Sequence, residues 1–197
     1  IDTAIGTLVA TNNTSGNIII VDSGSGGLSL GINSVAGLTS DTLRNNAANG
    51  AVTVGTTKDL FLGAPITVNG GAITLSGNNV DLDAAGAGRT IATSGAVMIS
   101  ATGVMHAIGT PGASYADITG GSVQLTAGDY IDLGHVAGHG NVMATSGPLN
   151  ITAGNSFGGC TSPGDCYSGA LTANGGNITV GTGSFFATPG AIGAPGG

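Results

Sequence analysis

One short pattern recurs along this chain and restricts its fold more than any other feature. The pattern is glycine, any residue, apolar, variable, apolar. Copies begin at Gly16, Gly26, Gly50, Gly71, Gly95, Gly121, Gly147 and Gly176. From Gly50 onward, successive copies are 21, 24, 26, 26 and 29 residues apart. A period in this range is typical of repeat proteins, in which each repeat buries its apolar face against the next.

Each repeat also contains a second and a third apolar anchor. The second follows the first by seven or eight residues, and the third precedes the next first anchor by five to seven. Only the gap between the second and third anchors varies widely, from Leu60–Ile66 to Val104–Ile118. Alternation of apolar and polar residues at these anchors is typical of strands with one buried face. The spacing therefore predicts three short strands per coil, two tight corners and one corner that takes insertions.

We predict an all-β fold, a right-handed parallel β-helix with three short strands per coil and about six to eight coils. Glutamate is absent and 39 of the 197 residues are glycine, which disfavours helices. The apolar fraction of 41% is high enough to build a core. An antiparallel sandwich would share this composition, but it does not explain one variable gap per repeat.

The expected organisation is one β-helix domain over residues 1–186. Residues 31–49 fit no coil well and are predicted to form a lateral insertion. Residues 187–197 are rich in proline and glycine, and we expect a linker or a strand exchanged with a neighbouring unit. The chain starts at Ile1 without an initiator methionine or a signal peptide, so we expect a processed product or a fragment.

The composition excludes two classes of partner. The chain has three basic and ten acidic residues, for a net charge of −7. Nucleic-acid binding requires clustered lysine and arginine, so we predict no nucleic-acid partner. No apolar run of eighteen residues is present, so we predict no insertion into a membrane.

Three segments, residues 71–82, 121–128 and 175–180, resemble shaft repeats of filamentous haemagglutinin-like proteins. These are large bacterial exoproteins secreted through an outer-membrane partner, and the resemblance covers most of the chain from Gly50 onward. It implies a secreted, cell-surface β-helix that serves as an adhesin, biofilm component or stalk, with no catalytic residues and no cofactor. The asparagine- and proline-containing motifs of the family's amino-terminal secretion domain are not visible, which implies shaft alone.

The same architecture leads to expectations about partners. Coils at the end of a stack expose unpaired strand edges, which pair readily with further strands. We therefore expect end-to-end self-association or the continuation of a longer rod. A host surface or a glycan is the expected external partner.

Two cysteines, Cys160 and Cys166, lie in one of the variable gaps and flank a Pro163-Gly164 turn signal. They predict a small disulfide loop in an oxidising compartment. Two thiols alone do not complete a tetrahedral metal site. We therefore predict that the pair closes a protruding loop.

Two histidines, His135 and His139, lie in another variable gap. This spacing suits a metal only on a helix, and the surrounding glycines argue against one, so we predict solvated loop histidines and no metal. The loops around residues 106–117, 134–141 and 158–170 form the expected contact surface. Its candidate residues are His106, Tyr115, His135, His139 and Tyr167.

A carbohydrate-active enzyme is the main alternative. Asp81 and Asp132 are predicted at matching outward positions of second strands, with Met105 at that position between them. Two coils correspond to about 9–10 Å, at the edge of the ~6.5–9.5 Å that separates the carboxyl groups of inverting glycosidases. Asp83 and Asp129 lie nearby, but no basic or aromatic cluster accompanies them. Solvated strand-face carboxylates are the simpler interpretation.

Ice binding is a weaker alternative. Thr53, Thr74 and Thr179 recur at one outward position of the first strands. An ice-binding face would need an uninterrupted row of threonines. This row is interrupted, because the same position of the repeat is occupied by Met98, Gln124 and Asn150 in the copies between.

Overall fold

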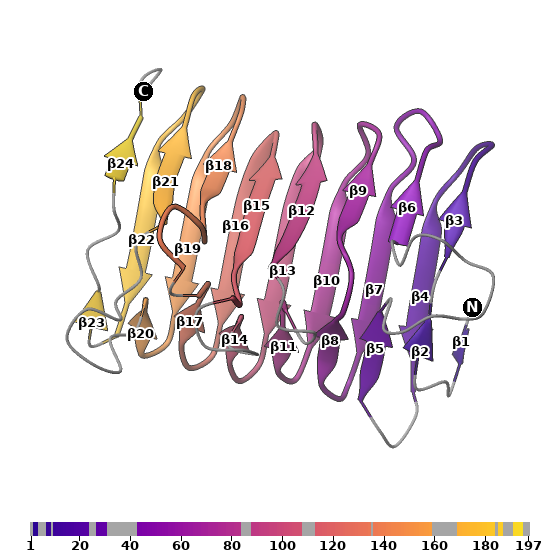
Figure 1. The fold of residues 1–197 in the computed structure, drawn as a ribbon, viewed down its shortest axis with the longest axis horizontal. Coiled ribbons are helices and arrows are strands. Elements are labelled where there is room, and N and C mark those ends of the chain that lie inside the picture. Colours follow the sequence, from indigo (N-terminus) through magenta and orange to yellow (C-terminus); the bar gives the residue numbers. More distant parts are fainter. Residues whose placement is uncertain are drawn as a thin grey trace.

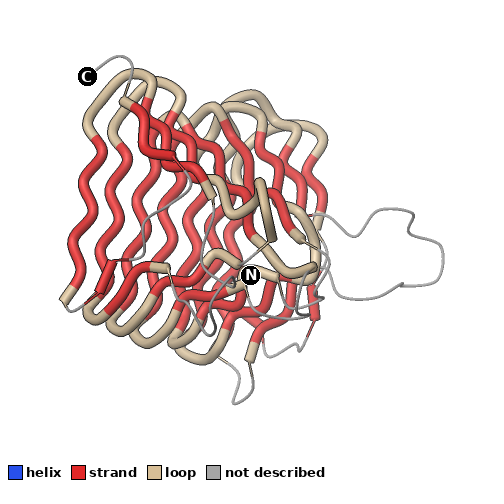
Figure 2. Tube along the Cα trace, turned by 60° about the vertical axis from the view of Figure 1, so that its left-hand side comes forward, coloured by secondary structure: helices blue, strands red, loops and turns tan. Residues whose placement is uncertain are grey.

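A computed structural model describes residues 2–3, 7–8, 10–23, 27–30, 43–83, 88–107, 113–134, 136–158, 169–183, 185–186 and 191–194. Throughout this part, three sheets of eight strands run side by side (Figure 1). All pairings between the named strands are parallel. The described residues form strands and loops without a helix (Figure 2). The prediction of an all-β parallel solenoid is confirmed.

Each coil contributes one strand to each sheet, in the order A, B, C along the chain. Sheet A contains β1 (Asp2–Thr3), β4 (Ile18–Asp22), β7 (Val52–Thr56), β10 (Ile73–Gly77), β13 (Ala96–Ala101), β16 (Ser122–Ala127), β19 (Leu149–Ala153) and β22 (Ile178–Thr182). Sheet B contains β2 (Thr7–Leu8), β5 (Leu28–Leu30), β8 (Leu60–Leu62), β11 (Val80–Asp81), β14 (Met105–His106), β17 (Ile131–Asp132), β20 (Ser156–Phe157) and β23 (Phe185–Phe186). Sheet C contains β3 (Thr11–Asn12), β6 (Leu43–Asn45), β9 (Ile66–Val68), β12 (Arg89–Thr93), β15 (Ala116–Gly120), β18 (Val142–Ala144), β21 (Ala170–Ala173) and β24 (Ala191–Gly193).

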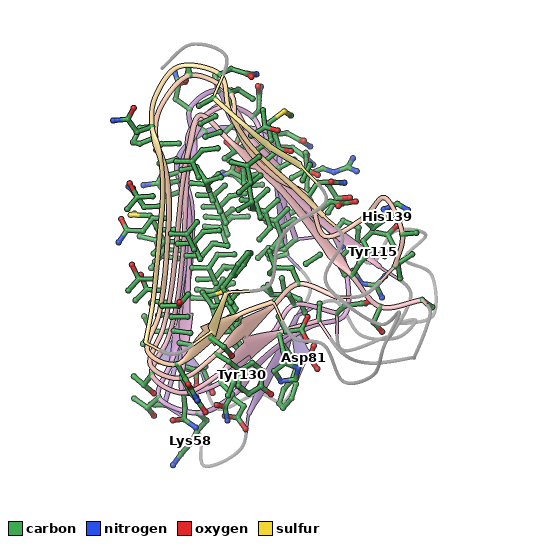
Figure 3. All side chains as sticks on the ribbon, turned by 90° about the vertical axis from the view of Figure 1, so that its left-hand side faces the viewer. Lys58, Asp81, Tyr115, Tyr130 and His139 are labelled. Carbon is green, nitrogen blue, oxygen red and sulfur yellow. The ribbon has the colours of Figure 1, made fainter. Side chains whose placement is uncertain are left out.

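The core lies between the three sheets and is built from columns of apolar side chains in register. Viewed along the stack, the strands of each sheet superimpose and enclose these side chains (Figure 3). In sheet A, for example, Leu75 lies between Val54 and Ile99, and none of the three is more than 1% exposed. Burying a side chain of this size contributes about 1.5–3 kcal/mol to folding. Because the columns run through successive coils, each repeat completes the core of its neighbours.

Glycines at the tight corner between sheets A and B let the backbones of neighbouring coils approach closely. A Cβ atom built on Gly154 would lie 2.0 Å from the carbonyl oxygen of Gly128, and one on Gly128 would lie 2.0 Å from that of Thr102. Real Cβ atoms do not approach backbone this closely. Glycine at these positions of the corner therefore has a steric reason.

The corner between sheets B and C takes the insertions, as predicted. The connection is short between β8 and β9, where it spans residues 63–65, and long between β20 and β21, where it spans 158–169. Every described connection from sheet A to sheet B is shorter than that. Insertions can lengthen this one corner without disturbing the stacked strands.

A buried asparagine stabilises the corner between sheets C and A. Asn45 occupies an inward position of β6 and is fully buried. Its side-chain amide donates hydrogen bonds to the carbonyl oxygens of Gly16 (3.1 Å) and Ala51 (3.0 Å). Its side-chain oxygen accepts one from the Ala47 amide (3.1 Å). These bonds pair the buried side chain fully and join three backbone groups at the corner.

Some positions differ from the sequence prediction. Leu28–Leu30, which matches the first-strand pattern, forms β5 in sheet B. Leu43–Asn45, within the predicted lateral insertion, forms β6, and residues 31–42 lie outside the described part. Ala191–Gly193, within the predicted tail, forms β24 and pairs with β21.

The second anchor in the repeat that begins at Gly95 is also corrected. Met105, not Val104, lies in register with Val80 and Ile131 and is fully buried.

The described residues contain no helical segment with the length and apolarity of a membrane span.

Candidate functional site

A row of ionisable side chains runs along the outer surface of sheet B. Asp81, His106 and Asp132 occupy the same register position in β11, β14 and β17. The matching positions predicted for Asp81 and Asp132 are confirmed, but the residue between them is His106, because Met105 points into the core. The row therefore alternates carboxylate, imidazole and carboxylate over three neighbouring coils.

Both carboxylates also stabilise the turn that follows their strand. The Asp81 carboxylate accepts a hydrogen bond from the Asp83 amide at 3.0 Å, and the Asp132 carboxylate accepts one from the Gly134 amide at 3.0 Å. Each bond spans two residues, the geometry of an Asx turn. Asp132 is only 7% exposed, so it offers little surface to a substrate.

Burial raises the pKa of Asp81 above its ordinary value of 3.8. The hydrogen bond from the Asp83 amide and the nearby His106 oppose this rise in pKa, and the charge of Asp83 adds to it. The pKa of Tyr130 is also raised, first by burial and then by the negative charges of Asp132 and Asp129. The Tyr130 and His106 rings are 6.5 Å apart and inclined at 43°.

A second group of side chains lies where sheet B meets sheet C (Figure 3). His139 Nδ1 is 3.0 Å from Asp117 Oδ2, and the Tyr115 ring stacks on the His139 ring with a centroid distance of 3.8 Å. The other oxygen of Asp117 accepts hydrogen bonds from the backbone amide (2.8 Å) and side-chain amide (3.1 Å) of Asn141. His139 thus has an acidic partner and an aromatic neighbour, in place of the purely solvated position that we predicted.

A buried carboxylate orders the adjoining coil. Asp83 accepts hydrogen bonds from the backbone amides of Gly88 (2.7 Å) and Tyr115 (3.3 Å), and Arg89 Nε lies 3.6 Å from it. Gly88 leaves room for the Tyr115 ring, since a Cβ atom there would lie 2.2 Å from that ring. Side chains of three successive coils are therefore in contact along this corner, whose described residues 82–83, 88, 107, 113–115, 133–134 and 136–141 we call the loop ridge.

Three of the predicted contact residues can be placed. His106 lies in the row on sheet B, and Tyr115 and His139 pack together on the loop ridge. His135, Tyr167, Cys160 and Cys166 lie outside the described residues. Among described residues, no group of three or more histidine, cysteine or acidic side chains is arranged to hold a metal ion.

Sequence reasoning did not select Asp117 or Asn141. The available signal was their position: Asp117 is an outward residue of a third strand, and Asn141 immediately precedes one. Both adjoin variable loops. An outward acidic or amide side chain at such a place can accept or donate bonds to the neighbouring loop.

Searches against known protein families, curated proteins and solved structures found no match to this chain.

Proposed function

We propose that this protein is a structural and adhesive segment of an extracellular β-solenoid rod, similar to the shafts of filamentous haemagglutinin-like exoproteins, and that it is not an enzyme. The last coil carries the argument. Ile178 and Val180 pair with the fully buried Leu149 and Ile151, yet they are only half-buried. Ile192 holds a core register in sheet C and is 55% exposed. Among the described residues, these apolar side chains of the last coil are thus less covered than their partners in the preceding coil.

The strands of this coil favour a further neighbour. β22, β23 and β24 each stand at the end of their sheet and pair with a strand on one side only. Unpaired backbone groups beside exposed apolar side chains form a template for the addition of strands. Another coil, from the same longer chain or from a second copy, would bury these side chains and complete the ladders.

The loop ridge supports the adhesive part of the proposal. Its side chains combine aromatic, imidazole and carboxylate groups, and they are held in place by hydrogen bonds and ring stacking between coils. Ordered polar and aromatic side chains suit recognition, because little conformational freedom is lost on binding. A glycan or a protein on a host surface is the proposed partner.

Electron microscopy tests the rod. Eight coils at about 4.8 Å span roughly 34 Å, so particles much longer than this indicate continued stacking. We expect long rods in the native source and concentration-dependent elongation of the purified chain. Val180→Asp is expected to stop elongation, because it places a charge on the exposed end of the core, whereas Thr172→Asp, on the outward side of β21, leaves elongation unchanged. Short single particles both in the native source and at high protein concentration would refute the proposal.

A polysaccharide hydrolase or lyase is the second candidate. The raised pKa of Asp81 is the observation in its favour, because a catalytic proton donor needs a pKa above that of an ordinary carboxyl group. Release of reducing ends from a panel of polysaccharides, abolished by Asp81→Asn, would support this candidate and refute the non-enzymatic one.

A further inference from the structure

The outward side of sheet A differs from the other surfaces of the solenoid because it carries no charge from β4 to β22. Two columns of outward side chains run along it in register. The first column is Ile19, Thr53, Thr74, Met98, Gln124, Asn150 and Thr179, and the second is Val21, Gly55, Ser76, Ser100, Thr126, Thr152 and Gly181. At one end of sheet A, Asp2 of β1 lies in register with Val21.

Exposed apolar side chains gather on the same surface. Four large apolar residues are highly exposed in the described part of the chain, and three of them, Ile19 (53%), Val21 (50%) and Met98 (41%), belong to these two columns. The rest of the second column is small: glycine, serine and threonine. Sheet A forms the straight wall opposite Tyr115 and His139 in Figure 3, so the surface is flat enough for another flat surface to approach it.

Charge indicates which partner fits. The chain has a net charge of −7, so two copies repel each other at long range. Sheets B and C expose carboxylates on their outward sides, including Asp81 and Asp117. Two copies that meet on sheet A avoid opposing these carboxylates, bury the exposed apolar residues and pair the amides of Gln124 and Asn150 across the interface.

Other partners fit less well. Polysaccharides are usually gripped by aromatic rings, and neither column contains one. Anionic membranes require basic residues, and neither column contains one. Ice would require uninterrupted threonine rows, which Met98, Gln124 and Asn150 break in the first column.

We infer that the outward side of sheet A is a lateral contact surface through which two copies of this solenoid pack face to face. Seven strands about 4.8 Å apart and five residues at about 3.3 Å per residue give a face of roughly 29 by 16 Å, so two faces bury roughly 900 Å². Stable interfaces bury upward of about 1,200 Å², so one chain forms a weak dimer. In a longer rod the area grows with every coil, and rods would bundle side by side. This inference goes beyond the proposed rod, since lateral packing does not require end-to-end stacking.

Analytical ultracentrifugation in a Val180→Asp background tests it, because that change removes the end-to-end contact. The parent is expected to dimerise reversibly. Met98→Lys on sheet A is expected to raise the dimer Kd at least tenfold, since two copies would place new charges in a dry contact. Met143→Lys is the matched control: it changes the same residue type on the outward side of sheet C, and Kd should stay within twofold. Gln124→Lys is a second test on the same surface, should Met98→Lys lose its far-ultraviolet circular dichroism signal.

A parent that stays monomeric at millimolar concentration would overturn the inference, as would equal weakening by the two methionine variants. Thermal hysteresis or adsorption to insoluble polysaccharide by a monomeric parent would assign the surface to ice or to a glycan, and would also overturn it. Failure of the rod proposal is recorded separately, by wild-type particles that do not elongate in the microscope.

Discussion

The close approach of coils at the corner between sheets A and B leads to a quantitative prediction for Gly154→Ala. The new methyl carbon would lie 2.0 Å from the carbonyl oxygen of Gly128. Ordinary carbon–oxygen contacts lie near 3.3 Å, so the coils must separate locally by roughly 1.3 Å. The hydrogen bond from the Gly154 amide to the Ala127 carbonyl, now 3.0 Å, would then be lost.

Overpacking costs about 1–3 kcal/mol and the lost hydrogen bond about 1 kcal/mol, so we expect Gly154→Ala to lower the free energy of unfolding by about 2–4 kcal/mol. Gly181→Ala is the matched control, because nothing lies within 4 Å of a Cβ atom there. We expect that control to change stability by less than about 0.5 kcal/mol. Gly55→Ala is a second control in the interior of sheet A, where only the mobile Ser76 hydroxyl lies near, at 3.1 Å.

Equilibrium urea unfolding followed by far-ultraviolet circular dichroism measures these differences, with hydrogen exchange to locate the loosened coils. Exchange is expected to speed up first in β16 and β19, which flank the altered corner. Equal midpoints for Gly154→Ala and Gly181→Ala would show that the corner tolerates a side chain. The steric reason given for glycine at this corner would then be wrong.

Three further predictions follow from the described contacts. Asn45→Ala removes a buried amide that serves three backbone groups, so the free energy of unfolding should fall by about 2–4 kcal/mol in thermal melts; an unchanged melt would contradict this role. Because burial raises the pKa of Asp81 in the folded state, its charged form costs stability as pH rises above the ordinary value of 3.8. Asp81→Asn should therefore be more stable than wild type at neutral pH and equal to it below that value, as urea midpoints across pH will show; a constant difference would contradict the assignment. Trypsin should digest the folded protein slowly and cut first at Lys58, which lies in an exposed corner, because Arg44 and Arg89 lie within strands. Mass spectrometry identifies the first fragments, and many early fragments would refute a compact solenoid.

The overall architecture was predictable because its signal is repeated. The spacing of Gly50, Gly71 and Gly95 gives the coil length, and the alternation in Ile73-Thr74-Leu75 gives the buried face. The single variable gap gives the corner that takes insertions. These patterns recur in every coil, so one irregular copy does not change the predicted fold.

The misplaced residues have local causes. Strands of sheet B such as β14 contain two residues, so one inward position decides the register, and adjacent apolar residues Val104 and Met105 satisfy it equally well in sequence. Strand β6 was not predicted, because the inward Asn45 breaks the apolar alternation. In the core, the polar atoms of the Asn45 side chain are satisfied by hydrogen bonds to the backbone.

The candidate site was harder to predict than the fold. The contact between Asp117 and His139 joins residues 22 positions apart, and it depends on how one loop folds over the next coil. No periodicity encodes such a contact. Sequence identified the corner on which these side chains lie, but not their partners.

Space on the loop ridge is limited by the distance between coils. Coils repeat about every 4.8 Å, whereas a loop that folds back as two chain segments is about 10 Å wide. Described residues of adjacent coils therefore pack against one another at this corner, as the Tyr115 ring does against Gly88 and the His139 ring. A receptor with a footprint of about 800 Å² would span several loops at once. Recognition would then depend on the order in which coils are stacked, so that exchanging two repeats would alter the surface even if every residue were retained.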